Sequence, residues 1–415
     1  MTIGAMTVLR ILVAGAVMLG VVLHGGAAAA DEAFARWVES LWPEAQQLGV
    51  SRTTFEAATR GLEPDLSLPD LKVPGRADTP PREQAEFVQP PEEYLKEATI
   101  ERLAAQGRKL AQQHGTTLAA IEREYGVAPA VLLAIWGRET AFGNARLGHN
   151  AIRVLATQAY LGRRKDYFRR EFLFALRMLQ EGHVQLAAMR SSWAGAMGLT
   201  QFLPSEFYKH AVDFDRDGRT DIWNSVPDAL ASAARQLVDK GWQRGRRWGL
   251  EVRAPAGVDC TRADPELKQP IRAWLAQGFV PAYGRKLSAE EQADEASLFL
   301  PEGIYGPAFL APKNYFVIKD YNFADLYVLF VGHLSDRIAD PRPFQTPWAK
   351  IEKLRTRQVE EIQQRLTAAG LYRDKIDGKA GMKTRLAVGA YQKANGLKLD
   401  CWPTAAVLAH MANGR

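Results

Sequence analysis

One glutamate in this sequence combines a position beside apolar residues with a side chain suited to acid–base chemistry. Glu139 follows the apolar run 131–136 after two residues, so its side chain is expected to start from an apolar wall. Burial would raise the pKa of such a carboxyl group, and a group partly protonated near neutral pH can protonate a glycosidic oxygen. Most glutamates near a helix end are instead solvated or paired, for instance with a neighbour such as Arg138. The carboxyl group alone leaves both interpretations open.

Two further segments carry groups that could bind a ligand. Between residues 191 and 205, glycines and other small residues allow the backbone to approach a ligand closely, and Ser192 and Gln201 could offer hydrogen bonds.

The second of these segments is an acidic loop that begins at Asp213. Aspartates stand at positions 1, 3, 5 and 9 of a twelve-residue loop, with glycine at position 6, which is the spacing by which a tight loop wraps oxygen ligands around Ca²⁺. The candidate ligands are the carboxylates of Asp213, Asp215 and Asp217 and the position-7 residue Arg219. Position 12 is Asn224 where glutamate is expected, so a solvated turn neutralised by Arg216 and Arg219 is the alternative.

The elements that must position these groups are mainly helices. Apolar residues recur at helical spacing over 34–41, 94–121, 131–136, 151–161, 166–181, 227–240 and 324–338, and Pro129 suits a first helical position. Prolines between 64 and 91 predict an extended segment. Residues 250–315 indicate short strands and turns with one helix near 271–277.

A proline-rich stretch, with Pro341, Pro343 and Pro347, marks the expected domain boundary. We expect a catalytic region over 31–345 and a module over 346–415 that forms helix, turn, helix, turn and short helix, with Thr404 capping the third helix.

The first thirty residues have the pattern of an export signal. Arg10 precedes an apolar run, and small residues at 27–30 precede Asp31, which is typical of a cleaved secretory signal; an uncleaved anchor is the alternative. We therefore expect a soluble periplasmic protein with no transmembrane anchor after cleavage.

The composition and net charge of the chain limit the kinds of binding partner but do not identify one. With 47% hydrophobic and 24% charged residues the chain is globular, and its net charge of +6 favours an anionic partner such as wall polymer, membrane surface or nucleic acid. Cys260 and Cys401 are too few for a disulfide framework, and whether they form one bridge stays open.

The catalytic candidates resemble two motifs of one family. The pattern Gly-x-Glu-Thr-x-x-Gly occurs at 137–143, and Ala-Gly-Ala-Met-Gly-x-x-Gln-Phe-x-Pro-Ser occurs at 194–205. In this order and separation they resemble the lytic murein transglycosylases of the membrane-bound B type, a lysozyme-like family, over roughly residues 34 to 340. The resemblance implies a mainly α, lysozyme-like α+β catalytic domain.

The resemblance also implies a mechanism with a single catalytic carboxylate. Glu139 would protonate the oxygen that links N-acetylmuramic acid to N-acetylglucosamine, while the sugar's acetamido group stabilises the developing positive charge. The glutamate anion would then take the proton of the muramoyl C6 hydroxyl, which attacks C1 and leaves a 1,6-anhydro end. Ordinary glycosidases need a second carboxylate, whereas here the substrate supplies that function. No cofactor is required for this chemistry.

By the same matching, several polar side chains would border the substrate or the glutamate. They are Ser192, Gln201, Tyr94, Tyr321, Asn322 and Tyr327, and packing within the core or its rim is the alternative for each. The chain departs from the family at Arg235 and Gln236, where Asn-Tyr is usual, so one sugar-stacking aromatic is expected to be missing. The family's calcium loop is EF-hand-like and is closed by a later aspartate, a position that Asp228 would fill. Calcium bound there would be structural.

The C-terminal residues resemble the three-helix peptidoglycan-binding domain. The matching positions are Ile362-Gln363, Leu366, Gly370-Leu371-Tyr372, Ile376-Asp377-Gly378, Gly381, Thr384, Ala387, Tyr391-Gln392 and Gly396-Leu397. Cys401 stands where the second turn usually has glycine. The module would raise the concentration of the enzyme at the wall, and a helical cap on the catalytic domain is the alternative.

Three functions follow from these expectations. The first is a peptidoglycan lytic transglycosylase, a lyase whose partners are glycan strands and proteins of cell-wall synthesis. The second is a muramidase that hydrolyses the same bond with water, and the third is a non-catalytic wall-binding scaffold. Nucleic acid is not an expected partner, because the basic residues are dispersed and follow an export signal.

Overall fold

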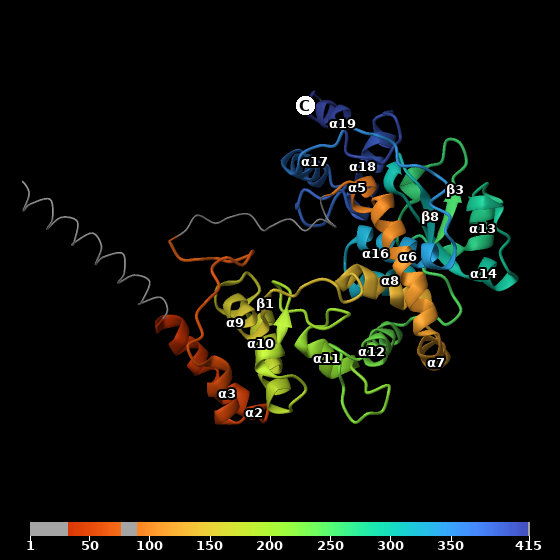
Figure 1. Ribbon diagram of the computed structural model, residues 1–415. Helices are drawn as coiled ribbons and strands as arrows, with labels where there is room; N and C mark the ends of the chain where they lie inside the picture. The colour runs from red at the N-terminus through yellow and green to blue at the C-terminus, as the bar shows by residue number, and fades with distance from the viewer. Residues whose placement is uncertain (1–31, 76–88, 414–415) are drawn as a thin grey trace, which may run out of the picture. The chain divides into compact units, whose positions relative to one another are not determined.

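The computed structural model describes residues 32–75 and 89–413, which fall into two compact units (Figure 1). Among these described residues, the first unit comprises 32–75 with Arg146–Ser225, and the second comprises 89–145 with 226–413. The predicted export signal over 1–30 lies outside the described residues.

The first unit is helical, with a small strand pair. Its described elements are helices over 32–40, α2 (Trp42–Gln47), α3 (Arg52–Thr59), α9 (Ala151–Leu161), α10 (Lys165–Gln180) and α11 (Pro204–His210), and strands β1 (His149–Asn150) and β2 (Arg190–Ser191). The predicted helices over 151–161 and 166–181 are confirmed as α9 and α10, which pack together. Residues 64–75 contain no helix, as the prolines predict.

The second unit is built around a buried helix, α8 (Pro129–Thr140), whose residues 131–137 are all buried. The other helices of this core are α5 (Pro91–Tyr94), α6 (Glu97–Gln113), α7 (Gly115–Tyr125), α12 (Val226–Asp239), α15 (Lys313–Tyr321) and α16 (Asp325–Ala339). Helices α6, α7, α12 and α16 pack against α8. A helix that is apolar on nearly every side needs such a complete cover.

The stretch 94–121, which the apolar spacing predicts to be helical, contains more than one helix. The chain forms α6 and α7 with a break at His114, and glycine occupies the first position of α7. Apolar spacing continues through the break, because both helices bury one face, and glycine is a poor residue for a helix interior.

The mixed region between 250 and 315 forms a five-stranded antiparallel sheet in the described residues. The order is β4 (Gln269–Pro270), β6 (Glu295–Phe299), β8 (Ala308–Pro312), β3 (Leu250–Arg253) and β5 (Val280–Pro281). The short strand β7 (Pro301–Ile304) follows β6, and α13 (Ile271–Ala276) and α14 (Ala289–Ala293) lie between strands in the sequence. The indole of Trp274, fully buried, donates to the Ala296 carbonyl at 2.8 Å. The predicted helix near 271–277 is therefore confirmed as α13, which is attached to the sheet through Trp274.

The C-terminal module has the three helices that its sequence predicts. They are α17 (Thr356–Ala368), α18 (Met382–Ala394) and α19 (Ala405–Asn413), packed around Ile362, Leu366 and Val388. Thr404 caps α19 through a hydrogen bond from the Val407 amide at 3.3 Å. The buried Gln363 side chain accepts from the amides of residues 377 and 378 and so fixes the turn before α18.

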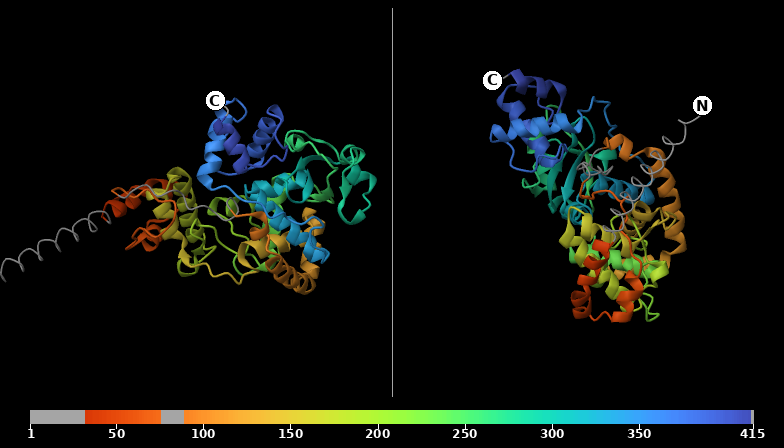
Figure 2. Two further views of the ribbon diagram at one scale, coloured as in Figure 1. Left: turned by 90° about the horizontal axis from the view of Figure 1, so that it is seen from above. Right: turned by 90° about the vertical axis from the view of Figure 1, so that its left-hand side faces the viewer.

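A disulfide joins this module to the sheet region, which settles a question that the sequence leaves open. Cys260 and Cys401 are bonded, with 5.9 Å between their Cα atoms. Beside the bridge, Lys393 pairs with Asp259 at 2.6 Å, and Tyr305 donates to Asp400 at 2.8 Å. The module, drawn in blue, lies beside the sheet region in the views of Figures 1 and 2, in agreement with these contacts. It is therefore fastened to the rest of its unit.

Cys401 also explains a departure from the usual module sequence. Its φ is 52°, in the left-handed region that favours the glycine expected at this turn. The Gln392 side chain accepts hydrogen bonds from the amides of Asp400 and Cys401 at 3.2 and 2.9 Å. The bridge and these bonds hold a conformation that a cysteine adopts only at some cost.

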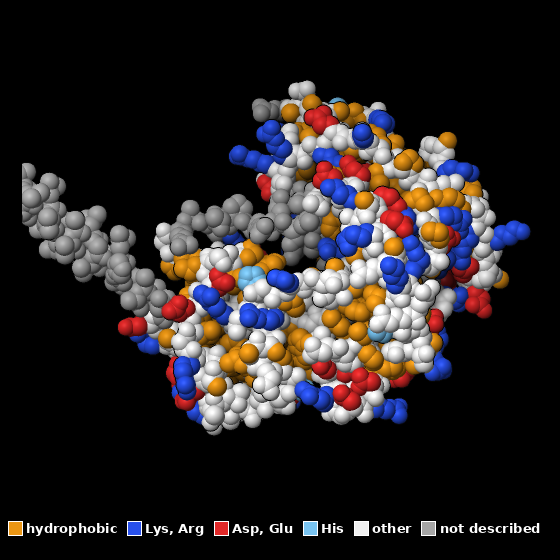
Figure 3. Space-filling view, viewed as in Figure 1, with side chains coloured by type: hydrophobic (Ala, Val, Ile, Leu, Met, Phe, Trp, Pro, Cys, Tyr) orange, Lys and Arg blue, Asp and Glu red, His pale blue; other side chains and the backbone are white. Residues whose placement is uncertain are grey.

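The surface bears both signs of charge. On the face shown in Figure 3, Lys and Arg side chains are interspersed with Asp and Glu and do not gather into one patch. Within the described ranges, no helix is both long and apolar enough to cross a membrane.

Candidate active site

Glu139 lies in the last turn of α8, where its side chain is half-buried. The hydroxyl of Tyr327, from the first turn of α16, donates to Glu139 Oε1 at 2.6 Å. Burial, and then the negative charge of Glu139, raise the pKa of Tyr327 well above its usual value. The phenol therefore stays protonated and remains a donor to the carboxyl group.

The guanidinium of Arg138 is held by Tyr94. Its guanidinium donates to the hydroxyl of Tyr94 through Nε at 3.0 Å and Nη2 at 2.5 Å, and it lies over the rings of Tyr94 and Phe330 at 5.1 and 5.2 Å. Burial lowers the pKa of Arg138, but Tyr94 and Glu139 outweigh this effect and raise it. A fixed positive charge thus stands next to Glu139 along the helix.

The turn after α8 accounts for the glycines of the first motif. Ala141, Phe142 and Gly143 all have positive φ, between 48° and 81°, so the chain reverses sharply after Thr140. This brings the Phe142 ring back onto Gly137, where a Cβ atom would lie 2.7 Å from the ring. Gly137 is required for that approach, and the ring closes the apolar wall below Glu139.

Two other predicted site residues lie close to Tyr327. Tyr321, at the end of α15, stacks parallel to the Tyr327 ring with 6.3 Å between centroids. Asn322 accepts a hydrogen bond from the Ala324 amide at 3.2 Å and so shapes the turn into α16. The second unit therefore brings Glu139, Tyr94, Tyr321, Asn322 and Tyr327 into one neighbourhood.

Ser192 and Gln201 belong to the first unit, in a compact loop. The Ser192 hydroxyl accepts from the amides of Ala194 and Ala196 at 3.3 and 3.2 Å. Gln201 has a φ of 57° and donates through Nε2 to the Gly198 carbonyl at 3.0 Å. Both side chains thus hold the loop's own backbone, and their predicted contacts with substrate or glutamate stay predictions.

The end of this loop is anchored by a buried carboxylate that the sequence did not single out. Glu171 of α10 is fully buried and accepts from the amide and the hydroxyl of Ser205, each at 2.8 Å. These bonds cap the first turn of α11, which begins at Pro204. The Pro-Ser pair that ends the second motif therefore fixes the loop to α10.

The acidic loop is bent around its aspartates. Asp213 Oδ2 accepts from the Gly218 amide at 3.0 Å, and Asp217 accepts from the Arg219 amide at 2.8 Å. Asp213 Oδ1 is buried without a hydrogen-bond partner, and Asp215 accepts from the Ser225 hydroxyl at 2.8 Å.

Two residues bear on how the acidic loop could be closed. Asn224, at position 12, donates through its amide to Asp221 at 3.0 Å. Asp228 belongs to the second unit, buried in the first turn of α12. Also in α12, Arg235 pairs with Asp239 at 3.7 Å and Gln236 is buried, so neither replaces a stacking aromatic.

Fold and site together define a lysozyme-like transglycosylase joined to a wall-binding module. The transglycosylase SLT domain family matches residues 33–336, and the putative peptidoglycan binding domain family matches residues 355–411. Because the first match covers well over half of the chain, the protein belongs to this lytic transglycosylase family, whose members are enzymes that cleave peptidoglycan. The resemblance read from the two motifs is thereby confirmed.

Individual relatives agree with this assignment. SltB3 from Pseudomonas aeruginosa, solved in complex with NAG-anhNAM-pentapeptide, is 36% identical with a TM-score of 0.81, over 92% of this chain and 99% of that one. Slt35 from Escherichia coli, solved in complex with calcium, is 26% identical with a TM-score of 0.51, over 61% and 78%. Membrane-bound lytic murein transglycosylase B of Escherichia coli (strain K12) is 31% identical over 216 residues, 52% of this chain. That match spans 58% of the curated relative's length.

Proposed function

We propose that this protein cleaves the β-1,4 bond between N-acetylmuramic acid and N-acetylglucosamine and leaves 1,6-anhydro-muramoyl ends, with Glu139 as the sole acid and base. The observation that carries the proposal is the half-buried Glu139 at the end of the buried helix α8, with the Tyr327 hydroxyl 2.6 Å from its Oε1. Family membership and the anhydro sugar bound to the relative SltB3 support it.

In the proposed reaction Glu139 first donates a proton and later accepts one. Neutral Glu139 gives its proton to the glycosidic oxygen as the bond to C1 breaks, and the acetamido oxygen of the same sugar stabilises the positive charge at C1. The Glu139 carboxylate then accepts the proton of the C6 hydroxyl, whose oxygen bonds to C1 and closes the anhydro ring. Water is not consumed, and Glu139 ends in the form in which it began.

Tyr327 serves the second half of this cycle. A hydrogen bond donated to a carboxyl group favours the carboxylate, as does the nearby charge of Arg138. The first half of the cycle uses the neutral form of Glu139 and the second half uses its carboxylate.

The decisive experiment pairs a substitution with product analysis. Glu139→Gln keeps the size of the side chain and removes the acid, so cleavage of isolated sacculi is expected to fall at least about a hundredfold, while sedimentation with purified wall is retained. Mass spectrometry of wild-type products is expected to show anhydro-muropeptides. Reducing ends alone would indicate hydrolysis by a muramidase, and equal cleavage by the variant would remove Glu139 from the mechanism.

We further propose that the acidic loop from Asp213 to Asn224 holds a structural Ca²⁺. The buried Asp213 oxygen that lacks a partner fits this cation, and so does the all-oxygen donor set of Asp213, Asp215, Asp217 and the Arg219 carbonyl. Asp228 is our candidate for the closing carboxylate. Bound there, calcium would stiffen the loop that connects the second motif to α12.

The remaining expectations stand as parts of the same proposal. Residues 1–30 would direct export to the periplasm, residues 31–345 would form the catalytic region, and residues 346–415 would hold the enzyme at the wall. Ser192 and Gln201 would orient the glutamate or the substrate, in addition to holding their loop. Glycan strands are the substrate, and proteins of cell-wall synthesis are proposed partners.

A further inference from the structure

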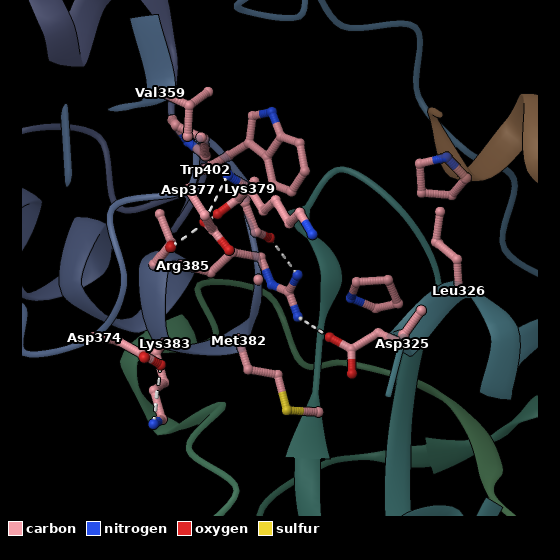
Figure 4. A pocket seen from close by; sticks show the side chains of 18 of the residues that line it. Asp325, Leu326, Val359, Asp374, Asp377, Lys379, Met382, Lys383, Arg385 and Trp402 are labelled. Atoms are coloured by element: carbon pink, nitrogen blue, oxygen red, sulfur yellow. Dashed lines mark hydrogen bonds and ion pairs between the residues drawn. The ribbon is translucent and has the colours of Figure 1, made fainter. Parts of the chain in front are cut away.

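A pocket of about 550 Å³ lies where the C-terminal module meets the start of α16. Lys379, Met382 and Trp402 of the module face Asp325 and Leu326 of α16 across it (Figure 4). Arg385 spans the floor and reaches Asp325 at 3.4 Å. The disulfide and the contacts around it keep the two walls in place, so the pocket belongs to the fastened arrangement of the module.

The pocket lies at the first turn of α16, the helix that also carries Tyr327. Leu326 lines it, and the next residue, Tyr327, donates to the Glu139 carboxyl group. Phe323, in the turn between α15 and α16, also lines the pocket. Its side chain is 77% exposed, and the exposure of so large an apolar surface to water is unfavourable unless a ligand covers it.

The charged side chains that line the pocket indicate which kind of ligand it could bind. Among the described residues, six basic and three acidic side chains line the pocket. Four of the bases are already paired: Lys319 and Arg385 with Asp325, Lys383 with Asp374 at 3.0 Å, and Lys353 with Glu302 and Glu92, which lie outside the lining. The lining keeps a small positive surplus, and its residue Lys375 is exposed. Such a lining attracts carboxylates.

In peptidoglycan, the carboxylates are carried by the peptide. N-acetylglucosamine is neutral, and the lactyl carboxyl group of N-acetylmuramic acid is consumed where a peptide is attached. The peptide itself has free carboxylates and small methyl side chains, which suit the apolar surfaces of Phe323, Met382 and Trp402. We propose that this pocket binds the stem peptide of a muramoyl residue in the glycan strand, so that the module and the start of α16 together recognise the peptide while the catalytic residues act on the sugar. The proposal rests on the function proposed above.

A direct binding measurement separates this inference from the catalytic one. The probe is a free pentapeptide with the alanyl–γ-glutamyl–diaminopimelyl–alanyl–alanine sequence, titrated calorimetrically into the full-length protein. Lys375→Glu reverses an exposed charge and is expected to weaken peptide binding about tenfold or more, and Phe323→Ala is expected to weaken it several-fold. Arg373→Glu is the matched control, since Arg373 is an exposed basic residue of the same connection that does not line the pocket.

Cleavage gives the second readout. Glycan strands with intact peptides and strands stripped of peptide by an amidase are compared as substrates, and the wild type is expected to prefer the first in kcat/KM. Lys375→Glu is expected to reduce this preference at least severalfold, and Arg373→Glu to keep it. Equal peptide binding by wild type and Lys375→Glu, or an unchanged preference, would overturn the pocket assignment. Absence of any cleavage with intact peptide binding would instead contradict the proposed enzyme activity alone.

Discussion

The hydroxyl of Tyr327 donates to Glu139 Oε1 at 2.6 Å across a sequence separation of 188 residues. The contact exists because α16 packs directly on the buried helix α8. Glu139 is the residue that the sequence marks most clearly for acid–base chemistry. For Tyr327, the sequence left a role in packing as an equal alternative to a role at the site.

Loss of this hydroxyl is expected to slow the reaction without unfolding the protein. Tyr327→Phe keeps the ring and its stacking on Tyr321, and it removes a hydrogen bond to a charged group, a contribution of about 1.5–3 kcal/mol. We expect kcat to fall about tenfold or more, and the alkaline limb of the pH–activity profile to move to higher pH, because the carboxylate loses a donor. Steady-state kinetics on a soluble glycan oligomer between pH 4 and 9 measures both. An unchanged profile with reduced thermal stability would reduce Tyr327 to a packing role.

Removal of calcium is expected to destabilise the protein without abolishing the chemistry. At a concentration one hundred times its dissociation constant, an ion that binds only the folded state contributes about 2.7 kcal/mol. We expect a chelator to lower the melting temperature by several degrees, and Asp213→Asn to remove most of that response. Glu63→Gln, at an exposed acidic residue elsewhere in the same unit, serves as the control. An identical melting temperature with calcium and with chelator would refute the site.

The disulfide is expected to contribute strongly to the stability of the second unit. Replacing both cysteines by serine removes a bridge across 141 residues, which typically costs about 2–5 kcal/mol. The variant that combines Cys401→Gly with Cys260→Ser loses the same bridge, but glycine adopts the positive φ at residue 401 without strain. We therefore expect its free energy of unfolding to be about 1–2 kcal/mol higher than that of the double serine variant.

Urea unfolding of the wild type and the two variants measures this difference. Equal stability of the two variants would mean that a non-glycine residue at position 401 costs no backbone free energy.

His333 is expected to make stability depend on pH. Burial, and then the charge of Arg337, lower its pKa to about 3, and Glu97 at 3.9 Å does not reverse this because Arg337 already pairs with Glu97. Between the folded pKa and the ordinary value near 6.5, only the unfolded chain takes up a proton. The free energy of unfolding therefore falls as pH drops below about 6.5, by up to about 1.4 kcal/mol per unit.

His333→Phe keeps the stacking on Phe344 and removes the titration. Between pH 7 and 5, we expect the variant to lose about 2 kcal/mol less than the wild type in urea unfolding. Parallel losses in the two proteins would show that other groups carry the acid sensitivity.

Much of the secondary structure and the identity of the family were determined by the sequence. Local patterns suffice for these, because apolar spacing marks each buried face and because the motifs at 137–143 and 194–205 encode tight turns that few residues can form. Gly137 is explained within its own motif, because a Cβ atom there would lie 2.7 Å from the Phe142 ring.

Only the tertiary structure decided which distant groups meet. The pairing of Cys260 with Cys401, the bond from Tyr327 to Glu139 and the bonds from Arg138 to Tyr94 join residues brought together by packing, and no local rule encodes such contacts. The break between α6 and α7 was missed for a related reason, since apolar spacing reports which face is buried and not whether the axis continues. The peptide pocket arises in the same way, because its walls come from segments that meet only when the module docks beside α16.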